Sequence, residues 1–201
     1  MKEKLKMKDS GKRQTFEGGA VRDTAEGKPQ WSLLSPWVYS MGMVAGPGTY
    51  DEEDRGAEIE VISNTMNKLR VFMLLGPGSG ECKGKSLMGN TLYDLLRLYG
   101  VERLCNWLTL GAEKYSRFNW SKGMNFSRVV DSLLRHLRAI VDHDYSEDHP
   151  AACCCNAMFL YHYLMEIKAG RMDPKWDDRF EFNFLGGPAA TQNDDDGGQL
   201  I

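Results

Sequence analysis

Carboxylate, imidazole and guanidinium side chains gather between residues 111 and 156 of this chain. In order, the segment contains Gly-Ala-Glu-Lys-Tyr at 111–115, then Asn119-Trp120, Asp131, Arg135-His136, Glu147-Asp148-His149 and Asn156. A cation held by carboxylates can neutralise phosphate groups and orient a water molecule for attack. The segment therefore predicts metal-assisted chemistry on a phosphate compound.

Composition narrows the class of protein that carries these side chains. A chain of 201 residues, 42% of them hydrophobic, can bury one sizeable core. The net charge of -3 gives no general attraction to nucleic acid or to an anionic membrane. No apolar run approaches the roughly 18 residues that a membrane-spanning helix needs, and the lysine-rich N-terminus lacks the apolar core of a signal peptide. We therefore expect a cytoplasmic protein without a nucleic acid or membrane partner.

The five cysteines give no sign of a metal or disulfide framework. They include no C-x-x-C pair, and the three consecutive ones, Cys153 to Cys155, cannot all face one partner on a helix. We expect them to be small buried side chains.

Three segments have the spacing of apolar residues that is typical of helices, at 89–116, 126–143 and 148–169. They predict an all-α fold in which the helices form a bundle. Residues 57–75 fit either a helix or a short strand at their end, and 41–56 and 76–86 are interpreted as loops. The Gly84-Lys85-Ser86 sequence resembles the end of a phosphate-binding loop, but the spacing of the preceding glycines does not fit that motif.

Three regions organise the chain. Residues 1–36 are polar and are expected to form an arm that packs on the domain through a few apolar residues. Residues 37–185 form the predicted helical domain, and the low-complexity residues 186–201 are expected to be a disordered tail.

Helical periodicity shows where the polar residues of 126–143 point. The predicted core stripe contains Val129, Leu133, Leu134, Leu137, Ile140 and Val141. Asp131, Arg135, Arg138 and Asp142 share the opposite face, and His136 lies at the border. This face is either part of a site or a solvated row of ion pairs, each worth a few tenths of a kcal/mol.

The neighbouring helices differ from each other. In 101–115, the predicted core side chains are Leu104, Leu108, Ala112 and Tyr115, and Glu113 lies on the polar face. In 148–169, His149 and Asn156 share a mostly apolar stripe, so each must find a hydrogen-bond partner. A paired His and Asn inside the core and a role in a site both remain open. Asp148 and Pro150 suit the start of this helix.

At these residues the chain resembles the phage dATP/dGTP diphosphohydrolases, which are related to the all-α MazG nucleotide pyrophosphohydrolases. The matching stretches are 10–13, 19–23, 27–29, 33–36, 107–115, 119–120, 131–137 and 149–156. Residues 42–90 resemble an insertion relative to the family. The paired E-x-x-E and E-x-x-D motifs of the wider MazG group are absent.

The resemblance implies hydrolysis of dGTP or dATP to the monophosphate and pyrophosphate with Mg²⁺, by a homo-oligomer that builds its sites between subunits. It also implies that the dGMP product can feed phage synthesis of 2-aminoadenine. The alternative is a protein on the same scaffold that binds nucleotides or a host partner without catalysis, which the missing carboxylate pairs favour.

Each candidate residue has an expected role in this chemistry. Mg²⁺ prefers oxygen ligands, and the expected ligands are Glu113, Asp131, Glu147 and Asp148. The expected catalytic residues are Glu113, Asp131 and His149. The expected substrate-binding residues are Arg13, Arg22, Asp23, Lys28, Lys114, Asn119, Trp120, Arg135, His136 and Asn156. Within this set, the basic residues suit phosphate oxygens and Trp120 suits either a purine or the core.

Overall fold

The structure is a computed structural model that describes residues 12–15, 17–18, 21–23, 28–40, 55–75, 81–179, 182–183 and 187–188. Its α-helices are α1 (Pro36–Ser40), α2 (Arg55–Leu74), α3 (Glu81–Tyr99), α4 (Val101–Tyr115), α5 (Phe126–Val141) and α6 (His149–Lys168). Short 3-10 helices are η1 (Trp31–Leu33), η2 (Asn119–Lys122) and η3 (Pro174–Trp176). Two small antiparallel hairpins pair β1 (Arg13–Thr15) with β2 (Val21–Asp23) and β3 (Phe182–Asn183) with β4 (Gly187–Pro188). The predicted all-α class is confirmed. None of the described helices is long and apolar enough to cross a membrane.

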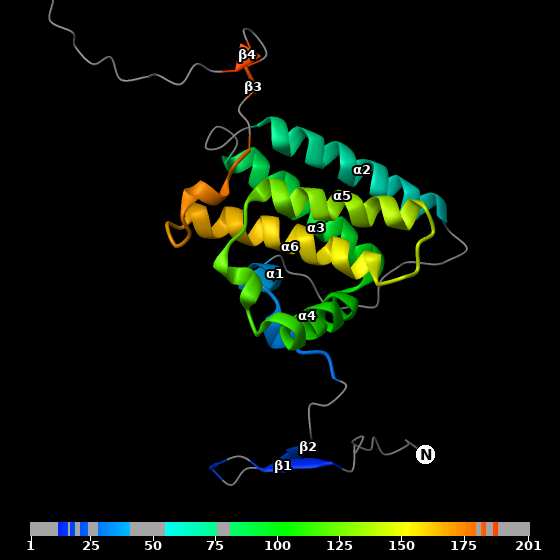
Figure 1. The fold of residues 1–201 in the computed structure, drawn as a ribbon, viewed down its shortest axis with the longest axis vertical. Coiled ribbons are helices and arrows are strands. Elements are labelled where there is room, and N and C mark those ends of the chain that lie inside the picture. The colour runs from blue at the N-terminus through cyan, green and yellow to red at the C-terminus, as the bar shows by residue number, and fades with distance from the viewer. Residues whose placement is uncertain are drawn as a thin grey trace, which may run out of the picture.

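Helix α6 lies at the centre of the bundle. It packs most extensively against α3 and α5, and also against α4. Figure 1 shows α5 and α6 running side by side, with α2 on one side of them and α4 on the opposite side. Residues 151–158 are all buried, as expected for a helix that is apolar around its whole circumference. The buried Cys105, Cys153, Cys154 and Cys155 are free thiols, in agreement with the expected role of small core side chains.

The core is closed on one side by stacked aromatic rings and a buried ion pair. Phe126 of α5 stacks on Phe72 of α2 and on Tyr163 of α6, with ring centroids 6.0 and 6.2 Å apart. The guanidinium of Arg179 lies over Phe72 at 4.2 Å and binds the carboxylate of Asp177. The chain that follows α6 is therefore anchored on α2 and α5.

Two expected boundaries were wrong. The segment 89–116 is not one helix, because Gly100 ends α3 and precedes α4 with a φ of 88°, which glycine adopts without strain. The loop expected at 76–86 is wrong for residues 81–86, which already belong to α3, whereas 76–80 lie outside the described residues. The ambiguous segment 57–75 is helical through Leu74.

Two expected core residues are exposed. Tyr115 is 61% exposed and Val141 is 44% exposed. Both lie at the last residue of their helix, where the following chain leaves the helical path. The other members of the two core stripes are buried or partly buried.

The predicted arm has two parts. The hairpin of β1 and β2 lies apart from the bundle (Figure 1), whereas η1 packs on α4. The backbone N–H of Gln30 donates to Thr109 Oγ1 at 3.0 Å, and Arg117 donates to the side chains of Gln30 and Ser32. The expected tail, 186–201, lies outside the described residues except for Gly187 and Pro188 of β4.

Candidate active site

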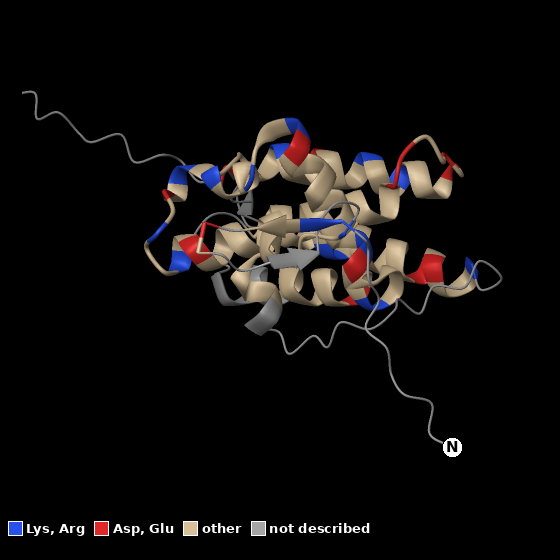
Figure 2. Ribbon diagram, turned by 90° about the horizontal axis from the view of Figure 1, so that it is seen from below, with Lys and Arg blue, Asp and Glu red and all other residues tan. Residues whose placement is uncertain are grey.

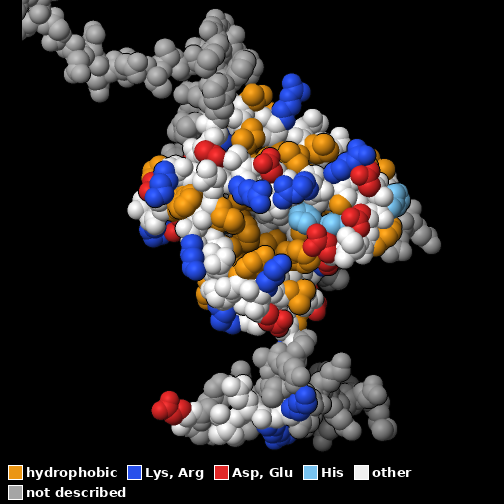
Figure 3. All heavy atoms as spheres, viewed as in Figure 1, with side chains coloured by type: hydrophobic (Ala, Val, Ile, Leu, Met, Phe, Trp, Pro, Cys, Tyr) orange, Lys and Arg blue, Asp and Glu red, His pale blue; other side chains and the backbone are white. Residues whose placement is uncertain are grey.

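A pocket of about 460 Å³ opens between α4, η2, α5 and α6. Leu33 of η1 closes one of its sides, so the anchored end of the arm forms part of the wall. Figure 3 shows the hollow on this face, with hydrophobic side chains inside it, basic side chains at its edge, and histidine next to acidic side chains. Of the predicted site residues, Asn119, Trp120, Arg135, His136 and Asn156 line this pocket.

The loop between α5 and α6 brings acidic and imidazole side chains to one end of the pocket. His143 adopts a left-handed φ of 57°, and the backbone N–H of Asp144 returns to Ala139 O at 2.9 Å. The Asp144 carboxylate then accepts a hydrogen bond from Ser146 N, which continues the turn. Figure 2 shows the acidic positions of this loop at the end of the bundle. The loop therefore returns the chain so that Glu147 and His149 face α5.

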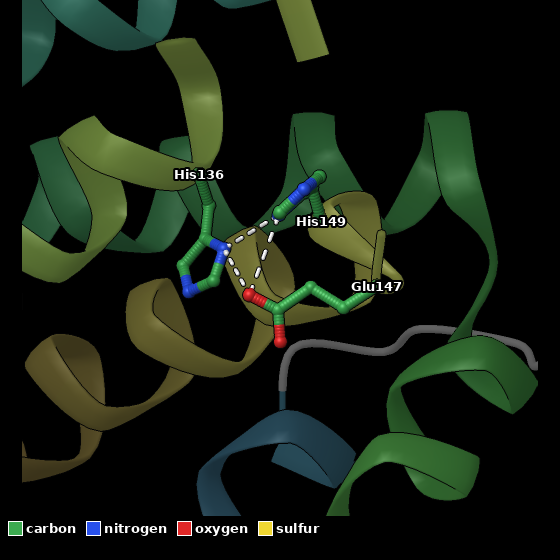
Figure 4. Close-up of side chains that lie close together, drawn as sticks. All are labelled: His136, Glu147 and His149. Carbon is green, nitrogen blue, oxygen red and sulfur yellow. Dashed lines mark hydrogen bonds and ion pairs between the residues drawn. The ribbon is translucent and has the colours of Figure 1, made fainter. Parts of the chain in front are cut away.

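His136, Glu147 and His149 form a compact cluster (Figure 4). The Nδ1 atoms of the two imidazoles lie 2.9 Å apart. One carboxylate oxygen of Glu147 lies 3.7 Å from each of these nitrogens. Among the described residues, this is the group of three whose ligand atoms all lie within 4.8 Å of one another, so it can hold a metal ion.

The two histidines have different surroundings. His136 is partly buried, and its edge meets the ring of Trp107. Burial lowers the pKa of His136, an effect that the nearby Glu147 carboxylate opposes. His149 is 4% exposed, and its Nε2 atom lies 3.4 Å from a carboxylate oxygen of Asp144. His149 does not pair with Asn156, whose side chain donates to Ala152 O at 2.8 Å.

Asp148 has two partners of its own. One carboxylate oxygen accepts the backbone N–H of Ala151, which confirms the predicted N-cap of α6. Both oxygens lie 2.8 Å from Nε of Arg103 on α4. The Asp148 side chain therefore positions the start of α6.

Aromatic side chains form the apolar wall of the pocket. Trp120 stacks on Phe159, with centroids 5.5 Å apart and the planes tilted by 12°. The ring of His162 meets Trp120 edge to face, with centroids 4.8 Å apart, and Tyr163 donates its hydroxyl to Trp120 O. One face of Trp120 is thus occupied by Phe159, and both rings belong to the pocket lining.

Two guanidinium groups line the pocket from α5. Arg128 and Arg135 are exposed, and neither forms an ion pair with any described residue. Arg128 was missed by the sequence analysis. The sequence contained the signal, because Arg128 and Arg135 are seven positions apart and therefore lie on nearly the same line of a helix.

The other predicted residues lie outside the pocket lining. Glu113 and Lys114 are exposed near the end of α4, and Asp131 is exposed on α5. Arg13 and Lys28 are exposed on the arm. Arg22 and Asp23 belong to β2, where Asp23 is opposite Arg13, but their side chains are outside the described part of the structure. The structure therefore does not gather the four predicted magnesium ligands into one group within the described chain.

Comparison with known proteins adds one match. Residues 81–174 match the family model described as the N-terminal part of dATP/dGTP diphosphohydrolase. This segment includes α3 to α6, η2 and every residue that lines the pocket except Leu33. No curated protein and no solved structure matches the chain significantly.

Proposed function

We propose that this chain, which belongs to the dATP/dGTP diphosphohydrolase family through residues 81–174, hydrolyses dATP and dGTP in the pocket between α4, α5 and α6. One water molecule attacks the α-phosphorus, and the bond from that phosphorus to the α–β bridging oxygen breaks. The products are the deoxynucleoside monophosphate and pyrophosphate.

The observation that carries the proposal is a pair of guanidinium groups, Arg128 and Arg135, which form no ion pair within the described part of the chain and lie beside an aromatic wall. Arg128 and Arg135 are two helical turns apart, which corresponds to about 10 Å of rise. A triphosphate chain is of similar extent and carries several negative charges. Arginine binds phosphate oxygens through its planar fork of N–H donors, so these two side chains suit a polyphosphate along α5.

The remainder of the pocket suits a nucleoside. Trp120 and Phe159 supply an apolar surface for a purine ring. Asn119, Ser132 and Asn156 supply polar groups at the same pocket, which fix the orientation of a ligand in such sites. Comparison of the rates with dGTP and dATP measures which purine these groups select.

Mg²⁺ dependence was predicted together with four carboxylate ligands, and the arrangement of these ligands does not fit one magnesium site in a single chain. Asp148 is paired with Arg103 and the α6 backbone, and Glu147 lies against two imidazoles. We therefore assign no step of the reaction to Mg²⁺. Glu113 and Asp131 remain candidates for ligands because both are exposed on helices that border the pocket.

We also propose that the protein is a homo-oligomer. The exposed polar faces of α4 and α5 leave the pocket open on one side, and a second subunit can bring further carboxylates to it. In this account, the arm hairpin lies over the pocket when nucleotide is bound. The supply of dGMP to a phage modified-base pathway is a further extension of the same proposal.

The alternative function is nucleotide binding without hydrolysis, favoured by the dispersed positions of the four carboxylates. A direct assay separates the two functions. The protein is incubated with dGTP, dATP, dCTP or dTTP, with Mg²⁺ or with a chelator, and the products are separated by ion-exchange chromatography. Release of pyrophosphate from the purine nucleotides supports hydrolysis. Tight binding of intact dGTP without product would establish the alternative.

A further inference from the structure

We propose that His136, His149 and Glu147 bind a divalent transition-metal ion of the Zn²⁺ class through two imidazole nitrogens and one carboxylate oxygen. This site differs from the predicted magnesium site in its ligands and in the ion that it selects. It does not depend on the proposed hydrolysis, because its primary test uses the metal ion alone.

The donor set decides the class of ion. Imidazole nitrogen suits Zn²⁺, Co²⁺, Ni²⁺ and Fe²⁺, whereas Mg²⁺ prefers an all-oxygen environment and retains several waters. Two histidines and one carboxylate leave further coordination positions open, as in catalytic zinc sites and in iron sites of this composition. Since His136 also lines the pocket, an open position on the ion can take a water molecule or a phosphate oxygen.

The spacing of the donor atoms agrees with binding to a common ion. Metal–nitrogen bonds of about 2.0–2.1 Å place two adjacent imidazole nitrogens about 2.9–3.4 Å apart, for angles at the ion of about 90–109°, and the two Nδ1 atoms are separated by 2.9 Å, at the lower end of this range. The Glu147 oxygen is 3.7 Å from each nitrogen. Its side chain is 48% exposed, so a small rotation brings the oxygen into bonding distance without moving the core.

A second observation concerns the opposite edge of His149. Its Nε2 atom is buried and has no hydrogen-bond partner of good geometry, but it lies 3.4 Å from a carboxylate oxygen of Asp144. Metal-binding histidines commonly donate their second N–H to a carboxylate, which fixes the tautomer and orients the ring. A proton on Nε2 leaves the Nδ1 lone pair directed at His136 and Glu147, where the ion would lie. Asp144 is thus the positioning residue of the site.

The competing explanation is a hydrogen bond between the two imidazoles with no ion. One Nδ1–H would then donate to the other Nδ1, and Glu147 would contribute only a nearby charge. This explanation accounts for the short nitrogen distance, but it predicts that no stoichiometric ion binds and that Asp144 has no influence on metal affinity.

The test is a titration of the metal-free full chain with Co²⁺, followed by visible absorption, and competition with Zn²⁺. We expect one equivalent of Co²⁺ per chain, with absorption bands that Zn²⁺ abolishes. Glu147→Gln is the principal variant because its side chain is exposed and the fold should tolerate it. We expect at least a roughly tenfold loss of Co²⁺ affinity in Glu147→Gln and His136→Gln, and a loss of about 10–100-fold in Asp144→Asn.

His143→Asn is the matched control. This imidazole lies on the same loop, is exposed and is not part of the cluster, and asparagine tolerates the left-handed backbone at this position. The control should bind Co²⁺ as the unaltered protein does. The proposal is overturned if the unaltered protein binds no stoichiometric Co²⁺ or Zn²⁺, or if Glu147→Gln and His136→Gln retain full affinity. Equal loss in His143→Asn would also overturn it, because the ion would then bind elsewhere on the loop.

Discussion

Arg103 of α4 and Asp148 at the start of α6 form a contact in which the arginine Nε lies 2.8 Å from both carboxylate oxygens. The same carboxylate caps α6 by accepting the N–H of Ala151. One side chain thus fixes where α6 begins and how it meets α4. Since His149 follows directly in the chain, this contact also sets the position of the imidazole next to the pocket.

We predict that Asp148→Ala lowers the free energy of unfolding by about 1–2 kcal/mol. Loss of the cap costs about 1 kcal/mol, and loss of a partly exposed ion pair adds up to about 1 kcal/mol. Urea unfolding followed by circular dichroism measures the difference. Asp148→Asn is the control, because asparagine also caps helices but does not pair with Arg103, and it should lose less. Equal stability of Asp148→Ala and the unaltered protein would show that α6 needs neither contact.

We predict that Arg128→Ala and Arg135→Ala each lower kcat/KM for dGTP by about 10–100-fold. A hydrogen bond to a charged group contributes about 1.5–3 kcal/mol, and about 1.4 kcal/mol corresponds to a factor of ten. Arg138→Ala is the matched control on the same helix, because Arg138 pairs with Asp142 and does not line the pocket. If all three variants have the same kcat/KM, phosphate does not bind along α5.

We predict that Glu113→Gln loses at least about 100-fold in kcat while the fold is retained. Glu113 remains a candidate ligand because it is an exposed carboxylate on a helix that borders the pocket, and a loss of this size is expected when a ligand of an essential cation is removed. Glu102→Gln removes another exposed carboxylate of α4 and should leave turnover unchanged. The measurement is kcat from steady-state kinetics at saturating Mg²⁺. A near-normal kcat in Glu113→Gln would remove this residue from the site.

We predict that deletion of residues 1–24 lowers kcat/KM for dGTP and dATP by about tenfold or more. The deletion removes Arg13 and Arg22 but keeps Gln30 and Leu33, which anchor the arm on α4 and in the pocket wall. Loss of one charged contact with phosphate is enough for an effect of this size. Thermal melting of the truncated chain serves as the control for folding. Unchanged kcat/KM would mean that the arm is not part of the site.

Much of the bundle could be predicted because the sequence patterns that specify its helices involve residues close together in the chain. The α5 core stripe and the Asp148 cap are set by residue types at fixed helical spacing, and both are present in the structure except that Val141 of the stripe is exposed. The break at Gly100 was missed because the apolar periodicity continues on both sides of it. The helical start at 81–86 was missed because Gly84 and the Gly-Pro-Gly-Ser-Gly sequence at 76–80 favour a loop when they are considered without their tertiary surroundings.

The candidate site could be predicted only in part. His136 and His149 were recognised as polar residues on two helices, but their contact depends on the turn at His143, whose positive φ has no signal in an isolated histidine. The partner of Asp148 is Arg103, which lies 45 positions away in the chain. No periodicity relates such distant positions, so contacts of this kind require the fold.

The central claim is that this chain splits dGTP into dGMP and pyrophosphate, and hydrolysis in ¹⁸O-labelled water tests it most directly. The protein is incubated with dGTP and Mg²⁺ in labelled water, and the products are identified by mass spectrometry. We predict equal amounts of dGMP and pyrophosphate, with one ¹⁸O atom in the phosphate of dGMP, and a much slower reaction for Arg135→Ala. Formation of dGDP and phosphate, or intact dGTP in the presence of protein that binds it, would contradict the account.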